Sequence, residues 1–398
     1  MEFLMRLLLR VLFKINGLVL LLLLVGCQAT APTAKADIEV KLNSFFHNDV
    51  FPGYKTVWIE NEQHVFSIDE DVKAFVDARL GKVKDPAKRI KALIGGIFDH
   101  ADLNLLYEND ANTVANATFA NRAANCLSLT IMTYAMADYA DLHVRFQQVT
   151  IPEFWVTRDG YSLLNGHINL RMYTRDKNAV VYSRDRSFQL DFDRRSLPKR
   201  LPTQIIDKER VMAMFYNNKG VDALLDNDYD KAYAYFRSAL ETDDQFSEAW
   251  ANLGLIYRWA GKLDYAETTY LQAIAVNNDD LTTWDNLSYL YSLTGRQEKA
   301  DEITARIERK RIGNPNYHFM LGETAASNKD YKEAIKHYRH AIKLDDADHQ
   351  FYFSMALAYY QLGETGYSEK FMRLAKRHAG EDRLEERYQR KLKLLAKR

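Results

Sequence analysis

One cysteine in the chain, Cys126, lies where its side chain could act as a nucleophile. It follows Asn125, a residue type that often caps helix N-termini, and an apolar stripe at helical spacing comes after it. The unpaired N–H groups and the dipole at a helix start stabilise a thiolate, which is the reactive form of cysteine. A backbone N–H there can also bind a developing oxyanion. The pattern predicts a helix that begins at Cys126 and activates its thiol.

Two later segments, "GHINLRMY" and "SFQLDFD", supply a candidate base and a candidate carboxylate. Residue alternation along a strand puts His167 and Asp191 on polar faces, while the other faces are apolar. If both apolar faces pack against the cysteine helix, His167 and Asp191 lie at the tip of that helix and form a Cys-His-Asp triad with Cys126. Asp193 and Asp185 are alternative third members. The competing interpretation is that Cys126 only packs in the core, as free cysteines often do.

These segments, with "NRAANCLSLTIMTYAMADYADLHVRFQQV", resemble the transglutaminase-like branch of the papain-like cysteine superfamily over about residues 85–195. The resemblance implies an α+β domain in which Cys126 is the nucleophile, His167 the general base and Asp191 the group that orients the histidine. It further implies a hydrolase or acyl transferase that forms a thioester from a protein or peptide amide. The chain departs from the family pattern at Asn125, where many members have glycine, and in the longer gap between His167 and Asp191.

The first 26 residues have the composition of a targeting segment, with basic residues followed by the apolar run "GLVLLLLLVG". The run ends in "LVGC", which resembles a bacterial lipobox and implies acylation of Cys27. Gln28 would then favour the outer membrane of a Gram-negative envelope, on its periplasmic side. Residues 27–37 would form the acylated cysteine and a tether. The alternative is an N-terminal membrane helix. If Cys27 carries lipid, Cys126 has no intramolecular disulfide partner.

The overall charge argues against several classes of function. Lys plus Arg and Asp plus Glu both number 54, so no basic excess is available to neutralise phosphates, and no nucleic-acid partner is expected. The chain has no glycine-rich phosphate loop, and we expect no cofactor. No cysteine or carboxylate spacing around His100 and His143 makes them metal ligands, so no metal is expected.

The C-terminal half repeats itself every 34 residues. A small residue recurs at Gly220, Gly254, Ser288, Gly322 and Ala356. The repeated blocks resemble tetratricopeptide repeats, in which small residues let two helices of a hairpin approach closely. Five units are predicted over residues 213–379, with a polar capping helix over 380–398.

Residues 38–205 carry two kinds of pattern in succession. Helical segments come first, one of them starting at Asp85 and Pro86, and short β-rich runs separated by Asp-Gly and Asn-Gly follow. The patterns therefore predict an α+β domain, which the resemblance implies is papain/transglutaminase-like, followed by an all-α tetratricopeptide-repeat solenoid, with a boundary near "SLPKRLPTQ".

A repeat array binds partners through the surface formed by the first helix of each hairpin. The register predicts a groove for a protein or peptide, lined by Asn217, Arg258, Asp285, Tyr289, Phe319, Phe353 and Tyr360. Two hypotheses follow. In the first, a lipid-anchored cysteine hydrolase or acyl transferase holds its protein substrate with the repeats. In the second, an adaptor lipoprotein with an inactive transglutaminase-like domain binds a partner without catalysis.

Overall fold

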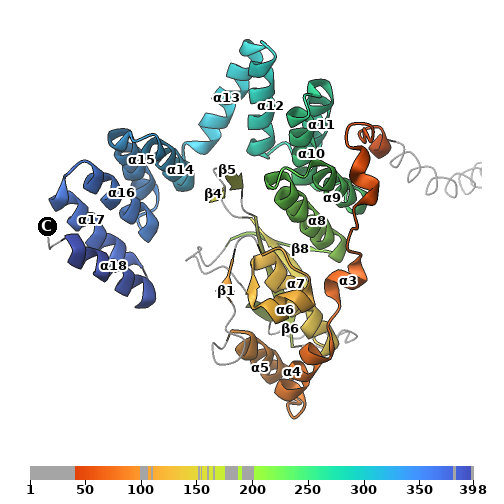
Figure 1. The fold of residues 1–398 in the computed structure, drawn as a ribbon. Coiled ribbons are helices and arrows are strands. Elements are labelled where there is room, and N and C mark those ends of the chain that lie inside the picture. Colours follow the sequence, from red (N-terminus) through yellow and green to blue (C-terminus); the bar gives the residue numbers. More distant parts are fainter. Residues whose placement is uncertain are drawn as a thin grey trace, which may run out of the picture. The chain divides into compact units, whose positions relative to one another are not determined.

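The computed structural model describes residues 41–98, 106–108, 111–150, 153, 155–158, 161–164, 166–174, 187–190, 201–379 and 382–395 (Figure 1). The chain divides into two compact units, residues 1–52 and 53–398. A short 3-10 helix, Pro52–Thr56, spans the division. Cys27 lies outside the described residues. Among the helices of the described part, none combines the length and the apolar character that crossing a membrane requires.

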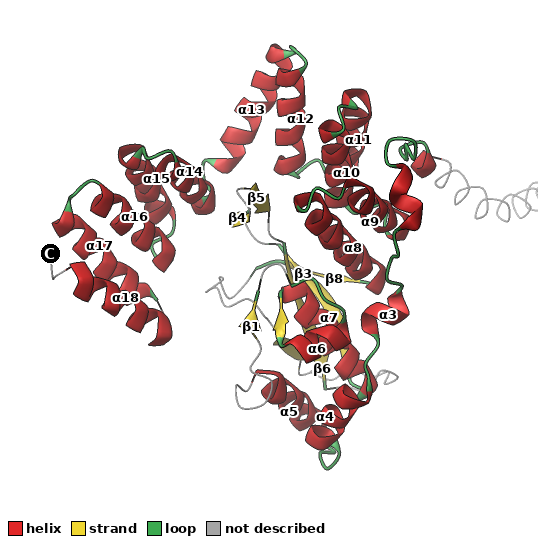
Figure 2. Ribbon diagram, viewed as in Figure 1, coloured by secondary structure: helices red, strands yellow, loops and turns green. Residues whose placement is uncertain are grey.

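The first part of the second unit begins with helices (Figure 2). They are α3 (Glu62–Phe66), α4 (Glu70–Leu80), α5 (Pro86–Phe98), α6 (Ala115–Asn121) and α7 (Cys126–Tyr139). The side chains of Asn61, Asp69 and Asn125 cap α3, α4 and α7 by accepting a hydrogen bond from a backbone N–H three residues later. The predicted helix starts at Pro86 and at Cys126 are both confirmed. Ten of the fourteen residues of α7 are buried, so this helix forms the centre of this part of the chain.

Strands follow α7. They are β3 (His143–Val149), β4 (Trp155–Arg158), β5 (Tyr161–Leu164), β6 (His167–Tyr173), β7 (Ser187–Leu190) and β8 (Thr203–Ile206), and a short parallel pair, β1 (Leu106–Tyr107) and β2 (Ala123–Ala124), precedes α7. Four of them form an antiparallel sheet in the order β7-β6-β3-β8. The predicted hairpin at the Asp-Gly turn is confirmed as β4 paired with β5.

One face of the four-stranded sheet packs on α7. Phe146 of β3 pairs with Leu170 of β6, and its ring stacks on Tyr134 of α7 with 4.2 Å between ring centroids. Leu170 and Met172 are fully buried. Helices on one side of a small antiparallel sheet make this part α+β. Its assignment to the transglutaminase-like family rests on the sequence resemblance alone.

The second part is an all-helical solenoid of five hairpins. Their helices are α8 (Lys208–Leu225), α9 (Tyr229–Thr242), α10 (Ser247–Trp259), α11 (Leu263–Val276), α12 (Leu281–Leu293), α13 (Gln297–Arg311), α14 (Pro315–Ser327), α15 (Tyr331–Leu344), α16 (His349–Gln361) and α17 (Thr365–His378). The first hairpin starts at Lys208, before the predicted position 213. The boundary predicted near residues 196–204 lies inside the second compact unit.

The recurring glycines are needed where two helices of a hairpin meet. A Cβ added at Gly220, Gly254 or Gly322 would lie 2.5–2.6 Å from a ring carbon of the aromatic residue 16 positions later. Those rings belong to Phe236, Tyr270 and Tyr338, which are buried. The glycines therefore permit a helix–ring contact that a side chain would prevent, so these hairpins need a glycine at this position of the repeat.

A further helix, α18 (Asp382–Leu395), follows the last hairpin. Its Tyr388 and Leu392 are buried in a cluster with Tyr352 and Met372 of the fifth hairpin. The Tyr388 hydroxyl also lies 2.7 Å from His349 Nδ1. Because α18 buries an apolar face that the last hairpin would otherwise expose, it is placed as a capping helix is expected to be.

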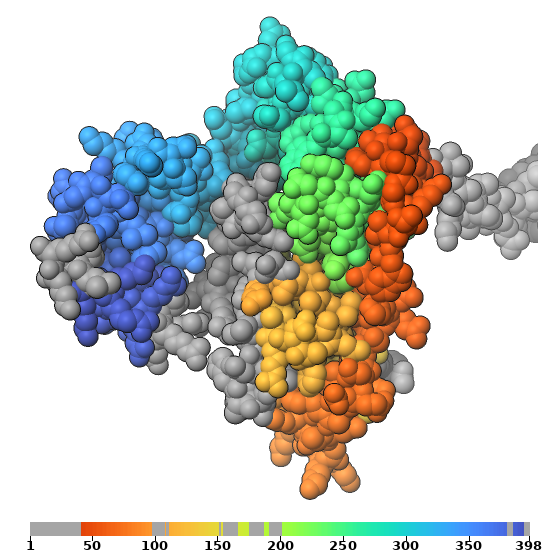
Figure 3. All heavy atoms as spheres, viewed as in Figure 1, coloured from red at the N-terminus to blue at the C-terminus, as the bar shows by residue number. Residues whose placement is uncertain are grey.

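Glu60, which lies just before α3, is bonded to the first hairpin, and the α+β part lies against this hairpin (Figure 3). The Tyr216 hydroxyl donates to the backbone carbonyl of Glu60 at 2.5 Å, and the Tyr235 hydroxyl donates to the Glu60 carboxylate at 2.8 Å. Burial, together with the nearby Glu60 charge, raises the pKa of Tyr216 to about 12. Burial and the Glu60 hydrogen bond also raise the pKa of Tyr235. Both phenols therefore stay neutral and keep donating at ordinary pH.

Candidate functional site

Cys126 is the first residue of α7 and is partly exposed. The Asn125 side chain accepts a hydrogen bond from Ser128 N at 2.9 Å, so the helix start is capped as predicted. A thiol at this position lies beside the N–H groups of the first helical turn, which favour its thiolate form.

The start of α7 is fastened to the first repeat through Asn112. The Asn125 amide donates to Asn112 Oδ1 at 2.5 Å, and the Asn112 amide donates to Asp222 Oδ2 on α8 at 2.6 Å. Asn218 of α8 also donates to Asn112 Oδ1, at 3.4 Å. The repeats thus help to position the residue that caps the cysteine helix. No sequence signal marked Asn112, which lies outside every motif.

His167 is the first residue of β6 and is 3% exposed. It pairs with Val149, and strand alternation puts it on the opposite face of the sheet from Leu170, whose face packs on α7. An approach of His167 to Cys126 therefore has to occur at the strand end rather than across the helix-covered face. Asp191 and its alternatives Asp185 and Asp193 lie outside the described residues, so the triad stays a prediction.

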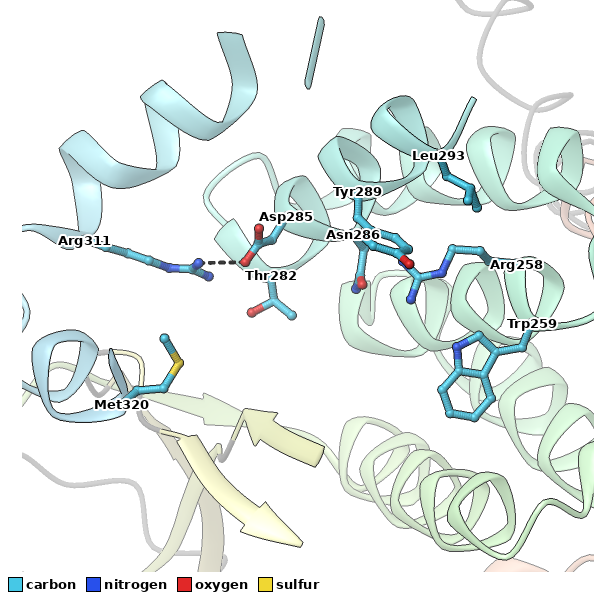
Figure 4. Close-up of a pocket in the computed structure, with 9 residues that line it drawn as sticks. All are labelled: Arg258, Trp259, Thr282, Asp285, Asn286, Tyr289, Leu293, Arg311 and Met320. Atoms are coloured by element: carbon cyan, nitrogen blue, oxygen red, sulfur yellow. Dashed lines mark hydrogen bonds and ion pairs between the residues drawn. The ribbon is translucent and has the colours of Figure 1, made fainter. Parts of the chain in front are cut away.

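A second candidate site is a hollow of about 580 Å³ in the repeats (Figure 4). It is lined by Arg258, Trp259, Thr282, Asp285, Asn286, Tyr289, Leu293, Arg311 and Met320. These residues come from α10, α12, α13 and α14. Three of the predicted groove residues, Arg258, Asp285 and Tyr289, are therefore brought together here.

The hollow combines exposed apolar groups with a cation. The Arg258 guanidinium lies 4.6 Å from the centre of the Tyr289 ring, within cation–π distance. Tyr289 and Leu293 are 58% and 55% exposed. An exposed aromatic ring, an exposed leucine and an arginine are the residue types that bind protein segments well.

Arg311, at the end of α13, is the most strongly bound residue of the hollow. Its side chain is 5% exposed, and it donates to both carboxylate oxygens of Glu153 at 2.7 and 2.9 Å. It also donates to Asp285 Oδ2 at 2.9 Å. Burial by itself would lower the pKa of Arg311, but the hydrogen bonds with Glu153 and Asp285 outweigh burial and raise it. The guanidinium therefore stays charged.

The other four predicted groove residues do not line the hollow. Asn217 is buried and accepts a hydrogen bond from Asn252 at 2.8 Å. Phe319 packs on Tyr338, Phe353 packs on Tyr388 of α18, and Tyr360 lies partly buried on α16. At least the first three have packing or hydrogen-bond contacts inside the array.

Sequence reasoning missed Trp259, Thr282, Asn286, Leu293, Arg311 and Met320. One signal was present for two of them, because Leu293 follows Trp259 by one 34-residue period and so shares its place in the repeat. No such signal marked Arg311, because its role depends on Glu153, 158 residues away in the chain.

Comparison with known families bears on the helical part. Residues 223–288 match the tetratricopeptide repeat family, and residues 322–363 match a TPR repeat family. The chain carries tetratricopeptide repeats.

Relatives match over limited lengths. The anaphase-promoting complex subunit 3 of Schizosaccharomyces pombe is 28% identical over 125 residues, which are 31% of this chain and 18% of that protein. The photosystem I assembly protein Ycf3 of Prochlorococcus marinus is 30% identical over 94 residues, 23% of this chain and 54% of that protein. The chain thus spans less than two thirds of either relative. The crystal structure of TTC0263, a thermophilic TPR protein of Thermus thermophilus, covers 44% of this chain and 96% of its own, with 22% identity and a TM-score of 0.28.

Proposed function

We propose that the protein is an adaptor that binds a segment of a partner protein in the hollow of its repeats. The observation that carries this proposal is the hollow itself, in which Tyr289 and Leu293 are exposed beside Arg258. Exposed apolar side chains that flank a charged group supply contact area, and the charged group adds orientation. Two of the relatives are a complex subunit and an assembly protein, which supports a role in protein interaction.

The adaptor proposal is tested by photo-crosslinking in cells. A photoreactive benzoylphenylalanine at position 289 is expected to capture a distinct partner protein. The matched control places the same group at Leu271, which is 46% exposed on α11 and does not line the hollow. Identical adducts from both positions, or none from position 289, would contradict the proposal.

A second candidate function is acyl transfer or hydrolysis at Cys126. The observation in its favour is the capped helix start, which places a partly exposed thiol beside the N–H groups of the first turn. The expected mechanism begins with attack of the thiolate on an amide carbonyl; the C–N bond then breaks, and the amine leaves with the proton that the base took from the thiol. Water or a second amine then attacks the thioester and releases the thiol. His167 would take the thiol proton, and an aspartate, Asp191 by the resemblance, would orient it.

Alkylation kinetics separate the two functions. Iodoacetamide is expected to alkylate Cys126 rapidly below the ordinary thiol pKa of about 8.5, and His167→Ala is expected to abolish that acceleration. If the thiol reacts only after denaturation, Cys126 is a packing residue and the adaptor function stands alone.

The location is also part of the proposal. We place the protein in a Gram-negative envelope, most naturally on the periplasmic side of the outer membrane, with a lipid on Cys27 as its anchor. Metabolic labelling with a fatty acid is expected to mark the wild type and not Cys27→Ser. Equal labelling of both would remove the anchor.

A further inference from the structure

Arg311, which lines the hollow, is paired with an acidic residue that comes from outside the repeats. Glu153 lies just before β4 in the α+β part, and both of its carboxylate oxygens accept hydrogen bonds from Arg311. Asn314, in the turn between α13 and α14, donates to the backbone carbonyl of the same glutamate at 2.9 Å. A paired guanidinium and a nearby amide therefore hold the side chain and the backbone of one glutamate residue, as a peptide-binding site would.

Glu153 is bound between the third and fourth hairpins, where the two neighbouring helices of successive hairpins have little contact. The helices α9 and α10, α11 and α12, and α15 and α16 pack directly between successive hairpins, whereas α13 and α14 scarcely touch. Ile312, in the turn that joins them, is 67% exposed. Arg311 is nevertheless buried, with the Glu153 carboxylate bound to its guanidinium.

The hollow also offers a second cation. Arg258 contacts the Tyr289 ring, and none of the ion pairs in the described part of the chain involves Arg258. The one acidic side chain that lines the hollow, Asp285, is bound to Arg311. If Glu153 left, the two arginines would outnumber the remaining carboxylate, and the hollow would attract an acidic ligand.

We propose that Glu153 is an internal ligand of this hollow, and that an acidic segment of a partner protein binds by replacing Glu153 on Arg311. The proposal rests on the adaptor function above and adds the charge of the ligand and its competitor. A tethered ligand is present at an effective concentration on the order of millimolar, so it excludes weak acidic segments. A partner with a second carboxylate for Arg258 has an interaction that Glu153 lacks.

The same competition links the two parts of the chain. A partner that displaces Glu153 also removes the contact of the segment before β4 with Arg311 and Asn314. Linkage is reciprocal. A change that stabilises the contact of Glu153 with Arg311 therefore weakens partner binding by the same free energy.

The direct test measures binding of a labelled peptide, TIPEFWVT (residues 150–157 of this chain), to the full chain by fluorescence anisotropy. Because Glu153→Gln removes the competing carboxylate, we expect it to bind the peptide at least about fivefold more tightly than the wild type. The peptide TIPQFWVT is expected to bind neither protein. The matched control is Asp279→Asn, which breaks an exposed ion pair with Lys310 on α13 and should bind like the wild type.

Three results would overturn the proposal. They are equal affinity of the wild type and Glu153→Gln, equal binding of the two peptides, and no binding to any variant. Each of them leaves the adaptor function intact if the crosslinker at position 289 still captures its own partner. Loss of that adduct as well would show that the adaptor function has failed.

A second measurement needs no substitution, in case Glu153→Gln folds poorly. Saturating TIPEFWVT is expected to raise backbone hydrogen exchange in β4 and β5 of the wild type, because the segment that precedes them is released. Unchanged exchange at saturation would mean that the peptide binds without displacing Glu153, and the proposal would be wrong.

Discussion

The second and third hairpins of the solenoid are consecutive units of the same repeat, but different residues form the contact between their two helices. In the second, Gly254 faces the fully buried ring of Tyr270. In the third, Ser288 and Thr304 stand at these two positions, and the Ser288 hydroxyl lies 2.9 Å from both the Thr304 hydroxyl and the Ala300 carbonyl. One hairpin is held by a ring against a glycine, the other by hydroxyl hydrogen bonds.

This difference coincides with the position of the hollow. The third hairpin supplies Asp285, Tyr289 and Arg311, and its second helix scarcely touches the next hairpin. Where the regular packing is relaxed, side chains that would otherwise be covered stay available for an external contact. If the adaptor proposal holds, the third hairpin is the one whose packing leaves side chains available for a partner.

Removing the ring should have the largest effect. Tyr270→Ala deletes a fully buried aromatic side chain and is expected to lower the free energy of unfolding by about 3–5 kcal/mol. Tyr270→Phe is the matched control, since the Tyr270 hydroxyl has no hydrogen-bond partner in the described part of the chain, and it should be nearly neutral. Urea unfolding followed by circular dichroism measures both. A small loss for Tyr270→Ala would mean that the ring does not hold the hairpin.

Filling the glycine position is expected to come next. Gly254→Ala puts a Cβ 2.6 Å from the Tyr270 ring, so the ring has to move, at about 1–3 kcal/mol of stability. Gly261→Ala is not a suitable control because the φ of Gly261 is +72°. Gly313→Ala is the matched control, because a Cβ at Gly313 would meet open space. Equal unfolding midpoints for Gly254→Ala and Gly313→Ala would contradict the close packing.

The hydroxyl pair of the third hairpin should contribute less. Ser288→Ala removes the hydrogen bonds to Ala300 and Thr304 and is expected to cost about 1 kcal/mol. The double variant Ser288→Gly with Thr304→Tyr places in the third hairpin the glycine and the tyrosine ring that the second hairpin has at these positions. If the two kinds of contact are interchangeable, the double variant unfolds at a higher urea concentration than either single variant; a midpoint below both would break the comparison.

The fourth hairpin adds a smaller, pH-dependent term. His318 lies 5.1 and 6.1 Å from His340 and His337, measured between ring centroids, and Glu333 and Lys336 are the other charged groups facing His337. Burial lowers the pKa of His337, an effect that Glu333 partly opposes and the other cations reinforce. Because the pKa of His337 is lower in the folded than in the unfolded protein, its contribution to stability is complete above about pH 6.5. That contribution is lost as the pH falls through the pKa of His337 in the folded protein. The melting temperature of the wild type should therefore fall more on acidification than that of His337→Gln, and parallel pH profiles would contradict this.

Local patterns were the part of the fold that the sequence revealed best. The 34-residue period predicted five hairpins because one hairpin occupies one period, and at Gly220, Gly254 and Gly322 the recurring small residue meets a ring on the adjacent helix of its own hairpin. Asn125 predicted the start of α7 because a capping side chain bonds a backbone N–H three residues away. The groove was predicted only in part. Arg258, Asp285 and Tyr289 meet in the hollow, whereas Asn217 and Phe319 make contacts inside the array.

The sequence by itself determined the elements whose stabilising contacts lie within one or two helical turns or one hairpin, because those contacts follow from residue spacing. The tertiary structure decided that Glu153 meets Arg311, that Asn112 joins the cap of α7 to α8, and that α13 and α14 separate. These contacts join residues more than a hundred positions apart or depend on how whole hairpins stack. No periodicity encodes them, since an ion pair forms only where folding has already brought both side chains together.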